Sequence, residues 1–295
     1  MHFLPTPIKF WEKLKCTRII KHALRDFRGN QTVTTIITLK EEIEMNYEGF
    51  LELVKNRRTI RRFKADPIPD AYVDRIIEAA RWAPSGFNSQ PWEFVVIKDK
   101  KLKDDVTRII KPPRPAQASG FSELEDMCEP WMRQKRHPWL DPEMEYQNAP
   151  VFILLFGDTR TQLGLPMEVR CDPHIKQSIY LSSLAYAFLY MHLAATTLGL
   201  ASQWVSSVAS PHNHCLLKDL LHIPNEMEVY DMIVLGYPAQ KSRPKLMRPL
   251  EKMVHRDYFS EESFRPDEEV RDFIKKTRAW VFATHQRGVD KNMVG

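Results

Sequence analysis

Residues 56–99 read NRRTIRRFKADPIPDAYVDRIIEAARWAPSGFNSQPWEFVVIKD, and the rest of the chain is organised around them. The stretch opens with arginines at positions 57, 58, 61 and 62, and clustered guanidinium groups match a phosphate or another planar anion. The loop at residues 83–92 carries amide and hydroxyl groups that suit hydrogen bonds to the edge of a flat heterocycle. Each motif alone is typical of a solvated turn or a strand entry. Their combination is unusual and indicates a ligand site.

Apolar periodicity predicts the elements on either side of this stretch. Residues 45–55 have helical spacing, and a second helix follows that we expect Asp70 to cap and Pro84 to end. Further helices are predicted around residues 216–221 and 268–282. Strands are predicted at residues 32–39, 93–98, 151–156, 201–208 and 229–235. This order of strands and helices predicts an α+β or α/β domain with a central sheet.

Residues 177–198 contain no Asp, Glu, Lys or Arg, and their length meets the threshold for a transmembrane helix. Serine, threonine and histidine residues within the segment, and soluble-type sequence on both sides, favour another interpretation. A helix that is uncharged all round is also expected where it is buried on every side, in a large core or an oligomer interface. We therefore predict a buried helix.

The 295 residues, 43% of them hydrophobic, suffice for one large or two small domains. We expect a main domain at residues 45–260, interrupted at 111–147 by a proline-bearing, aromatic-rich lid. Residues 1–44 form an N-terminal extension whose first part is basic and amphipathic. We expect that part to pack on protein, and contact with an anionic membrane surface is the alternative. A helical tail at residues 261–295 follows the main domain.

Composition excludes several classes of site. The four cysteines are scattered without a pairing pattern, which favours a reducing, cytoplasmic compartment. Residues 212–215 (HNHC) are expected to form a surface loop without a metal, because adjacent loop residues rarely converge on one ion. The net charge of +5 is spread along the chain, and no nucleic-acid-reading motif accompanies it. The chain has no G-x-G-x-x-G, P-loop or nucleophile elbow, so anion binding is left to side chains.

The arginine cluster RRTIRRF, the loop APSGFNSQPW and the strand after it resemble the opening of the nitroreductase family of FMN-dependent enzymes. The resemblance resumes at residues 199–206 and 236–255 and covers residues 45–257. It implies an α+β fold with a central, mostly antiparallel β-sheet flanked by helices. It also implies an intertwined homodimer that shares the uncharged helix and binds FMN at the subunit interface, with NADH or NADPH as reductant.

The resemblance assigns cofactor-binding residues by motif position. Residues of the first motif would hold the FMN phosphate, namely Arg57, Arg58, Thr59 and Arg61. A basic residue from the later run at 241–248 would join them, and the spacing does not decide between Lys245 and Arg248. The loop would contribute Pro84, Ser85 and Gly86 from the partner subunit, and polar contacts from Asn88 and Gln90. The segment that crosses the flavin near its N5 edge would be Gln203, Trp204, Val205 and Ser206.

The implied reaction is ping-pong, in which the reduced nicotinamide delivers hydride to flavin N5 and an electron-poor acceptor then takes it. Nitroaromatics and quinones are such acceptors, and no protein nucleophile is implied because the flavin carries the chemistry. The long lid and the start of the second helix also resemble relatives that fragment reduced flavin or remove halogen from aromatic rings. A third interpretation is a non-enzymatic flavin-binding or membrane-docked regulatory protein.

Overall fold

The computed structural model describes residues 46–110, 148–242 and 244–285. By its internal contacts the chain divides into two units, residues 1–52 and 53–295, and the helices and strands that form the site belong to the second. The expected amphipathic segment, the strand at 32–39 and the lid at 111–147 lie outside the described residues.

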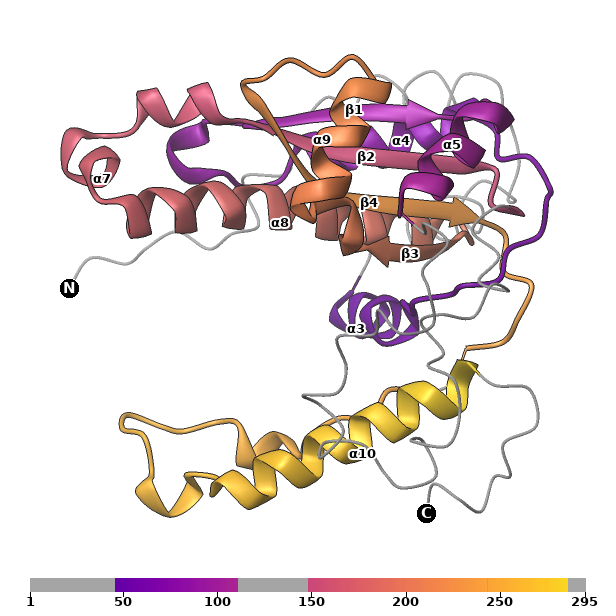
Figure 1. Ribbon diagram of the computed structural model, residues 1–295. Coiled ribbons are helices and arrows are strands. Elements are labelled where there is room, and N and C mark those ends of the chain that lie inside the picture. Colours follow the sequence, from indigo (N-terminus) through magenta and orange to yellow (C-terminus); the bar gives the residue numbers. More distant parts are fainter. Residues whose placement is uncertain (1–45, 111–147, 243, 286–295) are drawn as a thin grey trace, which may run out of the picture. The chain divides into compact units, whose positions relative to one another are not determined.

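The centre of the second unit is an antiparallel sheet with the strand order β1-β2-β4-β3 (Figure 1). The strands are β1 (Trp92–Ile97), β2 (Val151–Asp158), β3 (Ala201–Val205) and β4 (Met227–Gly236). Every neighbouring pair is antiparallel, so the predicted sheet is confirmed. The strand expected at residues 201–208 is shorter than predicted, because the backbone turns into the 3-10 helix η8 (Ser206–Ala209).

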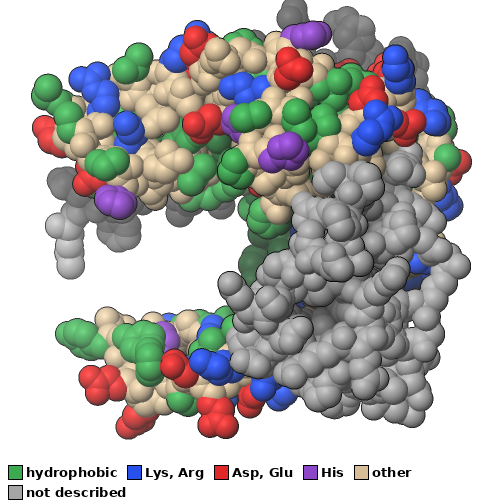
Figure 2. Space-filling model, in the orientation of Figure 1, with side chains coloured by type: hydrophobic (Ala, Val, Ile, Leu, Met, Phe, Trp, Pro, Cys, Tyr) green, Lys and Arg blue, Asp and Glu red, His purple; other side chains and the backbone are tan. Residues whose placement is uncertain are grey.

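Side chains alternate along β2, so the strand contributes to two separate cores. Ile153 and Leu155 pack with α4 (Asp70–Arg81) and α8 (Pro173–Thr197) on one face of the sheet. Phe152 and Leu154 lie in the core on the other face, which α5 (Lys100–Ile110) and α9 (Pro211–Leu220) cover. On the side shown in Figure 2, acidic and basic side chains are interspersed over the described surface. The continuous apolar run of β2 therefore reflects burial on both faces.

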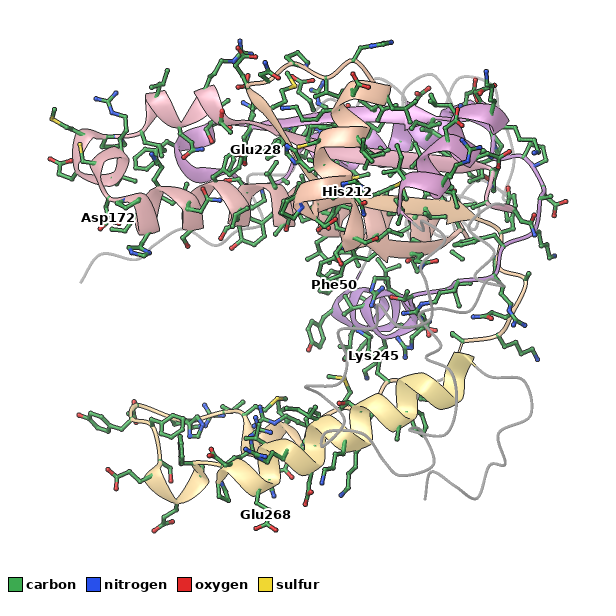
Figure 3. The ribbon with its side chains drawn as sticks, in the orientation of Figure 1. Phe50, Asp172, His212, Glu228, Lys245 and Glu268 are labelled. Atoms are coloured by element: carbon green, nitrogen blue, oxygen red, sulfur yellow. The ribbon has the colours of Figure 1, made fainter. Side chains whose placement is uncertain are left out.

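Helix α8 begins four residues earlier than predicted, because a strong cap precedes it. The carboxylate of Asp172, labelled in Figure 3, accepts the backbone N–H of His174 at 2.9 Å and of Ile175 at 3.0 Å. Helix α8 is long and apolar enough to cross a membrane, but core helices of soluble proteins meet the same criterion. Only one face of it is buried within the chain, whereas Leu181, Tyr186 and Leu189 are exposed. Within the described residues, burial on every side is therefore not achieved.

Two local predictions are wrong. Asp70 does not cap α4: it is the first helical residue after Pro69, and it forms an ion pair with Lys98. The segment 212–215 is not a loop, because Pro211 starts α9 and places His212 in its first turn (Figure 3). The remaining elements are α3 (Tyr47–Asn56), η3 (Gly86–Asn88), η7 (Thr159–Gly164), α7 (Met167–Cys171), η9 (Leu250–Lys252), η10 (Glu261–Ser263) and α10 (Asp267–His285).

Candidate functional site

The arginine segment lies along the outer edge of β3. Thr59 forms a parallel bridge with Ser202, and the backbone N–H of Ile60 donates to the Ser202 carbonyl at 3.1 Å. The side chain of Ile60 is buried in the core beneath α5 and α9, while Thr59 and Arg61 on either side of it are half-buried. This pairing covers an edge that would otherwise have unpaired backbone groups, and it places the basic cluster beside β3.

Arg57, Arg58 and Lys245 interact electrostatically, and the two arginines belong to the segment that pairs with β3. Burial and the neighbouring charge of Arg58 lower the pKa of Arg57. Burial lowers the pKa of Lys245 (Figure 3), and the charges of Arg57 and Arg58 lower it further. Arg248 instead donates to the backbone carbonyl of Lys252 at 2.9 Å. The charges of Lys245 and the two arginines therefore act on one another, whereas Arg248 forms its hydrogen bond with Lys252.

A buried histidine lies next to this cluster. His192 on α8 is 5% exposed, and its Nδ1 lies 2.7 Å from the hydroxyl oxygen of Ser202. Burial, and secondarily the charge of Arg57, lower the pKa of His192 to about 3, so the imidazole is neutral at physiological pH. The sequence analysis did not identify His192, because a histidine within an apolar helix is usually a core residue. Its hydrogen bond anchors Ser202 and the arginine segment that pairs with it.

An aromatic side chain follows on the same face of β3. Trp204 is 56% exposed, and its ring makes an edge-on contact with Phe188 of α8 at 6.0 Å between centroids. Asp231 on β4 is 5% exposed. Burial raises the pKa of Asp231 to about 6, and a hydrogen bond with Trp204 acts in the opposite direction. Sequence reasoning missed Asp231, although an acid inside the apolar run VYDMIVL was a visible signal.

Of the predicted segment 203–206, Gln203, Val205 and Ser206 do not share the environment of Trp204. Gln203 and Val205 are buried on the opposite side of the sheet from Ser202 and Trp204, because side chains alternate along the strand. A ligand on the α8 side would therefore meet Gln203 and Val205 only through their backbone. Ser206 is exposed at the start of η8.

The polar loop packs against α8 at a different point along the helix. The backbone N–H of Gly86 donates to the Ser183 hydroxyl at 3.2 Å, and a Cβ on Gly86 would lie 2.2 Å from Ile179. Only glycine, which has no Cβ, allows the loop to approach α8 this closely at position 86. Several non-glycine residues of the loop have left-handed φ angles: Phe87 (54°), Asn88 (54°) and Gln90 (43°). Such backbone strain concentrates at functional sites, and here it leaves the amides of Asn88 and Gln90 exposed.

The two halves of the predicted site are separated along α8. The loop meets the helix at Ser183, whereas the arginine segment meets it through His192, nine residues later. At 1.5 Å of rise per residue, these points lie roughly 14 Å apart along the helix axis. Within the described chain, the loop and the arginine cluster therefore do not form one continuous lining.

The chemistry of these groups fits a flat aromatic ligand that carries a phosphate. The cationic cluster matches the phosphate, the exposed indole matches an aromatic ring, and the loop amides match a heterocycle edge. In the described part of the chain, no group of three or more His, Cys, Asp or Glu side chains is arranged to hold a metal ion.

Comparisons with known proteins identify similar chains. A model described as the nitroreductase family matches residues 54–237. An iodotyrosine deiodinase of Thermotoga neapolitana is 27% identical over 197 residues, which are 67% of this chain and 92% of that protein. An NADH dehydrogenase of Thermus thermophilus is 28% identical over 221 residues, covering 67% of this chain and 91% of that protein. The crystal structure of oxidised iodotyrosine deiodinase bound to FMN and 3-iodo-L-tyrosine is 25% identical, with a TM-score of 0.54, and covers 71% of this chain and 99% of that one.

Proposed function

The chain belongs to the nitroreductase family, and from this premise we propose that it is an FMN-dependent oxidoreductase. We propose that it uses NADH or NADPH to reduce a nitroaromatic, a quinone or a similar electron-poor acceptor. The observation that carries the proposal is the electrostatic interaction of Lys245 with Arg57 and Arg58, two arginines of the segment that pairs with β3. Like charges repel one another, and a dianionic phosphate relieves that repulsion while it accepts hydrogen bonds from the guanidinium groups.

We assign the phosphate to Arg57, Arg58 and Lys245, with Thr59 held next to them by its bridge to Ser202. The flavin ring is assigned to the α8 side of β3, where Trp204 is exposed and Ser206 offers a hydroxyl group at the strand end. Arg61 is assigned to the pyrimidine edge of the ring, where its positive charge stabilises the anionic reduced cofactor. Pro84, Ser85, Gly86, Asn88 and Gln90 are assigned to the ring's other side, from a second subunit.

FMN, when bound, supplies hydride chemistry that no side chain of the chain can provide. The residues of the chain bind and orient it. Neutral His192 holds the Ser202 hydroxyl without adding a charge that competes with the arginines. The strained loop presents amides in one fixed arrangement, so that less conformational entropy is lost when a ligand binds.

We propose a homodimer, and the separation of the two half-sites along α8 and the helix's exposed apolar side chains support it. Leu181, Tyr186 and Leu189 form an apolar strip on the solvent-facing side of α8, and such strips mark protein interfaces. A second copy of the chain would cover the strip and bring its own loop to the arginine cluster. We expect a cytoplasmic location, and contact of the N-terminal segment with a membrane surface remains the weaker alternative.

Flavin binding is the direct test of the assignment. The purified protein is expected to be yellow, and the dissociation constant of FMN for the apoprotein is measured by quenching of flavin fluorescence. Arg57→Gln and Lys245→Gln are each expected to weaken binding roughly 10- to 100-fold, since each removes a charge-assisted hydrogen bond. Arg248→Gln and the exposed control Lys241→Gln should bind FMN like the wild type. Equal affinity in all four variants would contradict the site.

Reductive removal of halogen from an aromatic ring is the second candidate reaction. It is favoured by the deiodinase of Thermotoga neapolitana, 27% identical, and by the structure bound to FMN and 3-iodo-L-tyrosine. The NADH dehydrogenase of Thermus thermophilus, at 28% identity, supports the nicotinamide-dependent reaction to a similar degree. None of these three similar proteins has a name that points to fragmentation of reduced flavin.

An anaerobic acceptor panel separates the candidates. The flavin-loaded protein is bleached with NADH, NADPH or dithionite, and recovery of the oxidised flavin spectrum is followed after adding a nitroaromatic, a quinone or 3-iodo-L-tyrosine. We expect bleaching by a reduced nicotinamide and recovery with the nitroaromatic or quinone. Recovery with iodotyrosine alone, together with iodide release, would replace the first candidate with the second. Stable flavin that no acceptor reoxidises would support a non-enzymatic flavin-binding protein.

A further inference from the structure

We propose that Asp231 is a positioning residue of the flavin site, whose carboxyl group holds the exposed indole of Trp204 in one orientation against the bound aromatic ring. This inference rests on the proposed function, because it gives Trp204 a ring to contact. Asp231 itself is buried and touches neither the cofactor nor the acceptor in this assignment.

The register of β3 and β4 places the two side chains together. Trp204 lies opposite Ile233, and Asp231 precedes Ile233 by two residues, so all three side chains share the α8 face of the sheet. Diagonal neighbours in an antiparallel pair lie roughly 7–8 Å apart, which is within reach of an indole. The indole N–H of Trp204 is the hydrogen-bond partner of the Asp231 carboxylate.

A second contact fixes the same ring. The Phe188 ring of α8 meets the Trp204 ring at 6.0 Å and an interplanar angle of 60°, and it also meets Tyr230 at 6.2 Å. The indole is thus held at its N–H by a carboxylate and at its edge by a phenyl ring, while more than half of the residue's surface remains exposed. An ordered, exposed indole is a pre-organised stacking surface.

The buried acid is costly for the fold. Asp231 lies between apolar residues of β4 and is 5% exposed, and burial of a carboxylate costs far more free energy than burial of an aliphatic side chain. A valine or leucine would suit this core better. Trp204 also follows Ser202, the residue that pairs with Thr59, by one same-face step of roughly 7 Å along β3. The aromatic surface therefore adjoins the cationic cluster.

The surroundings of the carboxyl group involve three elements. From β4, Tyr230 is the titratable neighbour, and burial together with the charge of Asp231 raises its pKa. From β3 the neighbour is Trp204, whose ring contacts Phe188 of α8, and Phe188 also contacts His192 and Tyr230. Because His192 is neutral at physiological pH, the groups that respond to the charge of Asp231 are Trp204 and Tyr230.

Tryptophan fluorescence of the apoprotein tests the contact without any flavin. The wild type is titrated between pH 4 and 8 beside Asp231→Asn, Trp204→Phe and the control Glu78→Gln. In the control pair, the exposed Trp82 donates to the Glu78 carboxylate at 2.8 Å, so it has the same chemistry without burial. A change in emission with a midpoint near pH 6 is expected in the wild type and in Glu78→Gln. It should be absent from the other two variants, and its persistence in Asp231→Asn would overturn the inference.

Flavin affinity tests the positioning role. Asp231→Asn keeps an oxygen acceptor for the indole N–H and is expected to bind FMN like the wild type. Asp231→Leu removes the acceptor, and Trp204→Phe removes the donor, so each should bind FMN roughly 3- to 10-fold more weakly. Wild-type affinity in Asp231→Leu would overturn this inference and leave the proposed function intact. No FMN binding by the wild type itself would overturn the proposed function.

Discussion

Among single residues, burial acts on two titratable groups on the α8 face of β3 and β4. It lowers the pKa of His192 and raises that of Asp231, and both shifts favour the neutral form because a low-dielectric environment disfavours charge. At neutral pH the histidine is therefore uncharged, whereas Asp231 is ionised and partly compensated by the indole of Trp204. The charge pattern of the site thus depends on burial as well as on residue type.

The raised pKa of Asp231 predicts a specific dependence of stability on pH. Its pKa rises from 3.8 to about 6 in the folded protein, so the folded state binds the proton more tightly than the unfolded state. Stability contributed by this group is fully present below pH 3.8 and is lost as the pH rises through 6. Asp231→Asn has no carboxyl group at this position and does not lose this stability. The free energy of unfolding of the variant minus that of the wild type should therefore rise by up to about 3 kcal/mol from pH 4 to pH 7.5. Urea unfolding at the two pH values measures the difference, and a constant difference would contradict the prediction.

Gly157 predicts a steric effect in the core beneath α8. A Cβ at this position would lie 2.1 Å from the Tyr180 hydroxyl and 2.7 Å from Leu184. Gly157→Ala is therefore expected to destabilise the protein by about 1–3 kcal/mol, the usual cost of overpacking. The Tyr180 hydroxyl is buried and has no hydrogen-bond partner among the described residues, so adding Tyr180→Phe should recover part of the loss. Thermal unfolding measures both effects.

The control for this prediction is Gly164→Ala, since nothing lies within 4 Å of the Cβ position there. It should leave the melting temperature nearly unchanged. A loss equal to that of Gly157→Ala would indicate a backbone effect instead of a clash with Tyr180.

Among the elements, α8 determines how the site is built. One side of it carries the core residues of the α4 layer, and the same helix contacts both the arginine segment, through His192, and the polar loop, through Ser183. Its opposite side is apolar and exposed. A helix with both properties is expected to continue into a subunit interface, because apolar surface of this extent is rarely left in water.

We expect Leu189→Glu to convert the proposed dimer into a monomer. Leu189 is 46% exposed on α8, and a carboxylate there would be desolvated within the interface at a cost of several kcal/mol. Leu216 on α9 is 40% exposed, so Leu216→Glu is the matched control and should leave the dimer intact. Light scattering after size-exclusion chromatography gives the mass of each variant. A monomeric wild type, or a dimeric Leu189→Glu, would contradict the interface.

At the scale of the whole molecule, we propose that the loop of one chain and the arginine cluster of a second chain serve one ligand. Their contacts with α8 are separated by roughly 14 Å along the helix, and both halves carry groups suited to the same cofactor. This arrangement predicts complementation between chains that are defective in different halves.

We expect Arg57→Gln/Arg58→Gln chains and Asn88→Ala/Gln90→Ala chains to bind FMN weakly as separate preparations. When the two are co-expressed with different tags and the mixed dimer is purified, one site receives both intact halves and the other receives both defects. The mixed dimer should therefore bind one FMN with wild-type affinity. Affinity no better than that of the parent proteins would show that both halves serve one chain, or different ligands.

Much of the fold was accessible from the sequence because burial leaves a periodic pattern. Apolar runs located β1, β2 and β4, and the uncharged segment located α8. Errors occurred where neighbouring chemistry outweighed the pattern. Pro211 began a helix where a loop was expected, and the strand after residue 200 turned into η8 at Ser206. Of the candidate site, the motifs supplied the candidate segments but not the roles of His192 and Asp231, and the one local signal for Asp231 was an acid inside an apolar run.

The sequence by itself determined the classes of element, the basic cluster and the family resemblance, because these depend on local composition and spacing. It left the strand directions open between α+β and α/β, and the antiparallel expectation came from the resemblance. Only the tertiary structure related the charge of Lys245 to the arginines, and only it placed Asp231 behind Trp204. The physical reason is that these relations join residues far apart in the chain. They depend on strand register and on how the chain folds back, and neither leaves a local pattern.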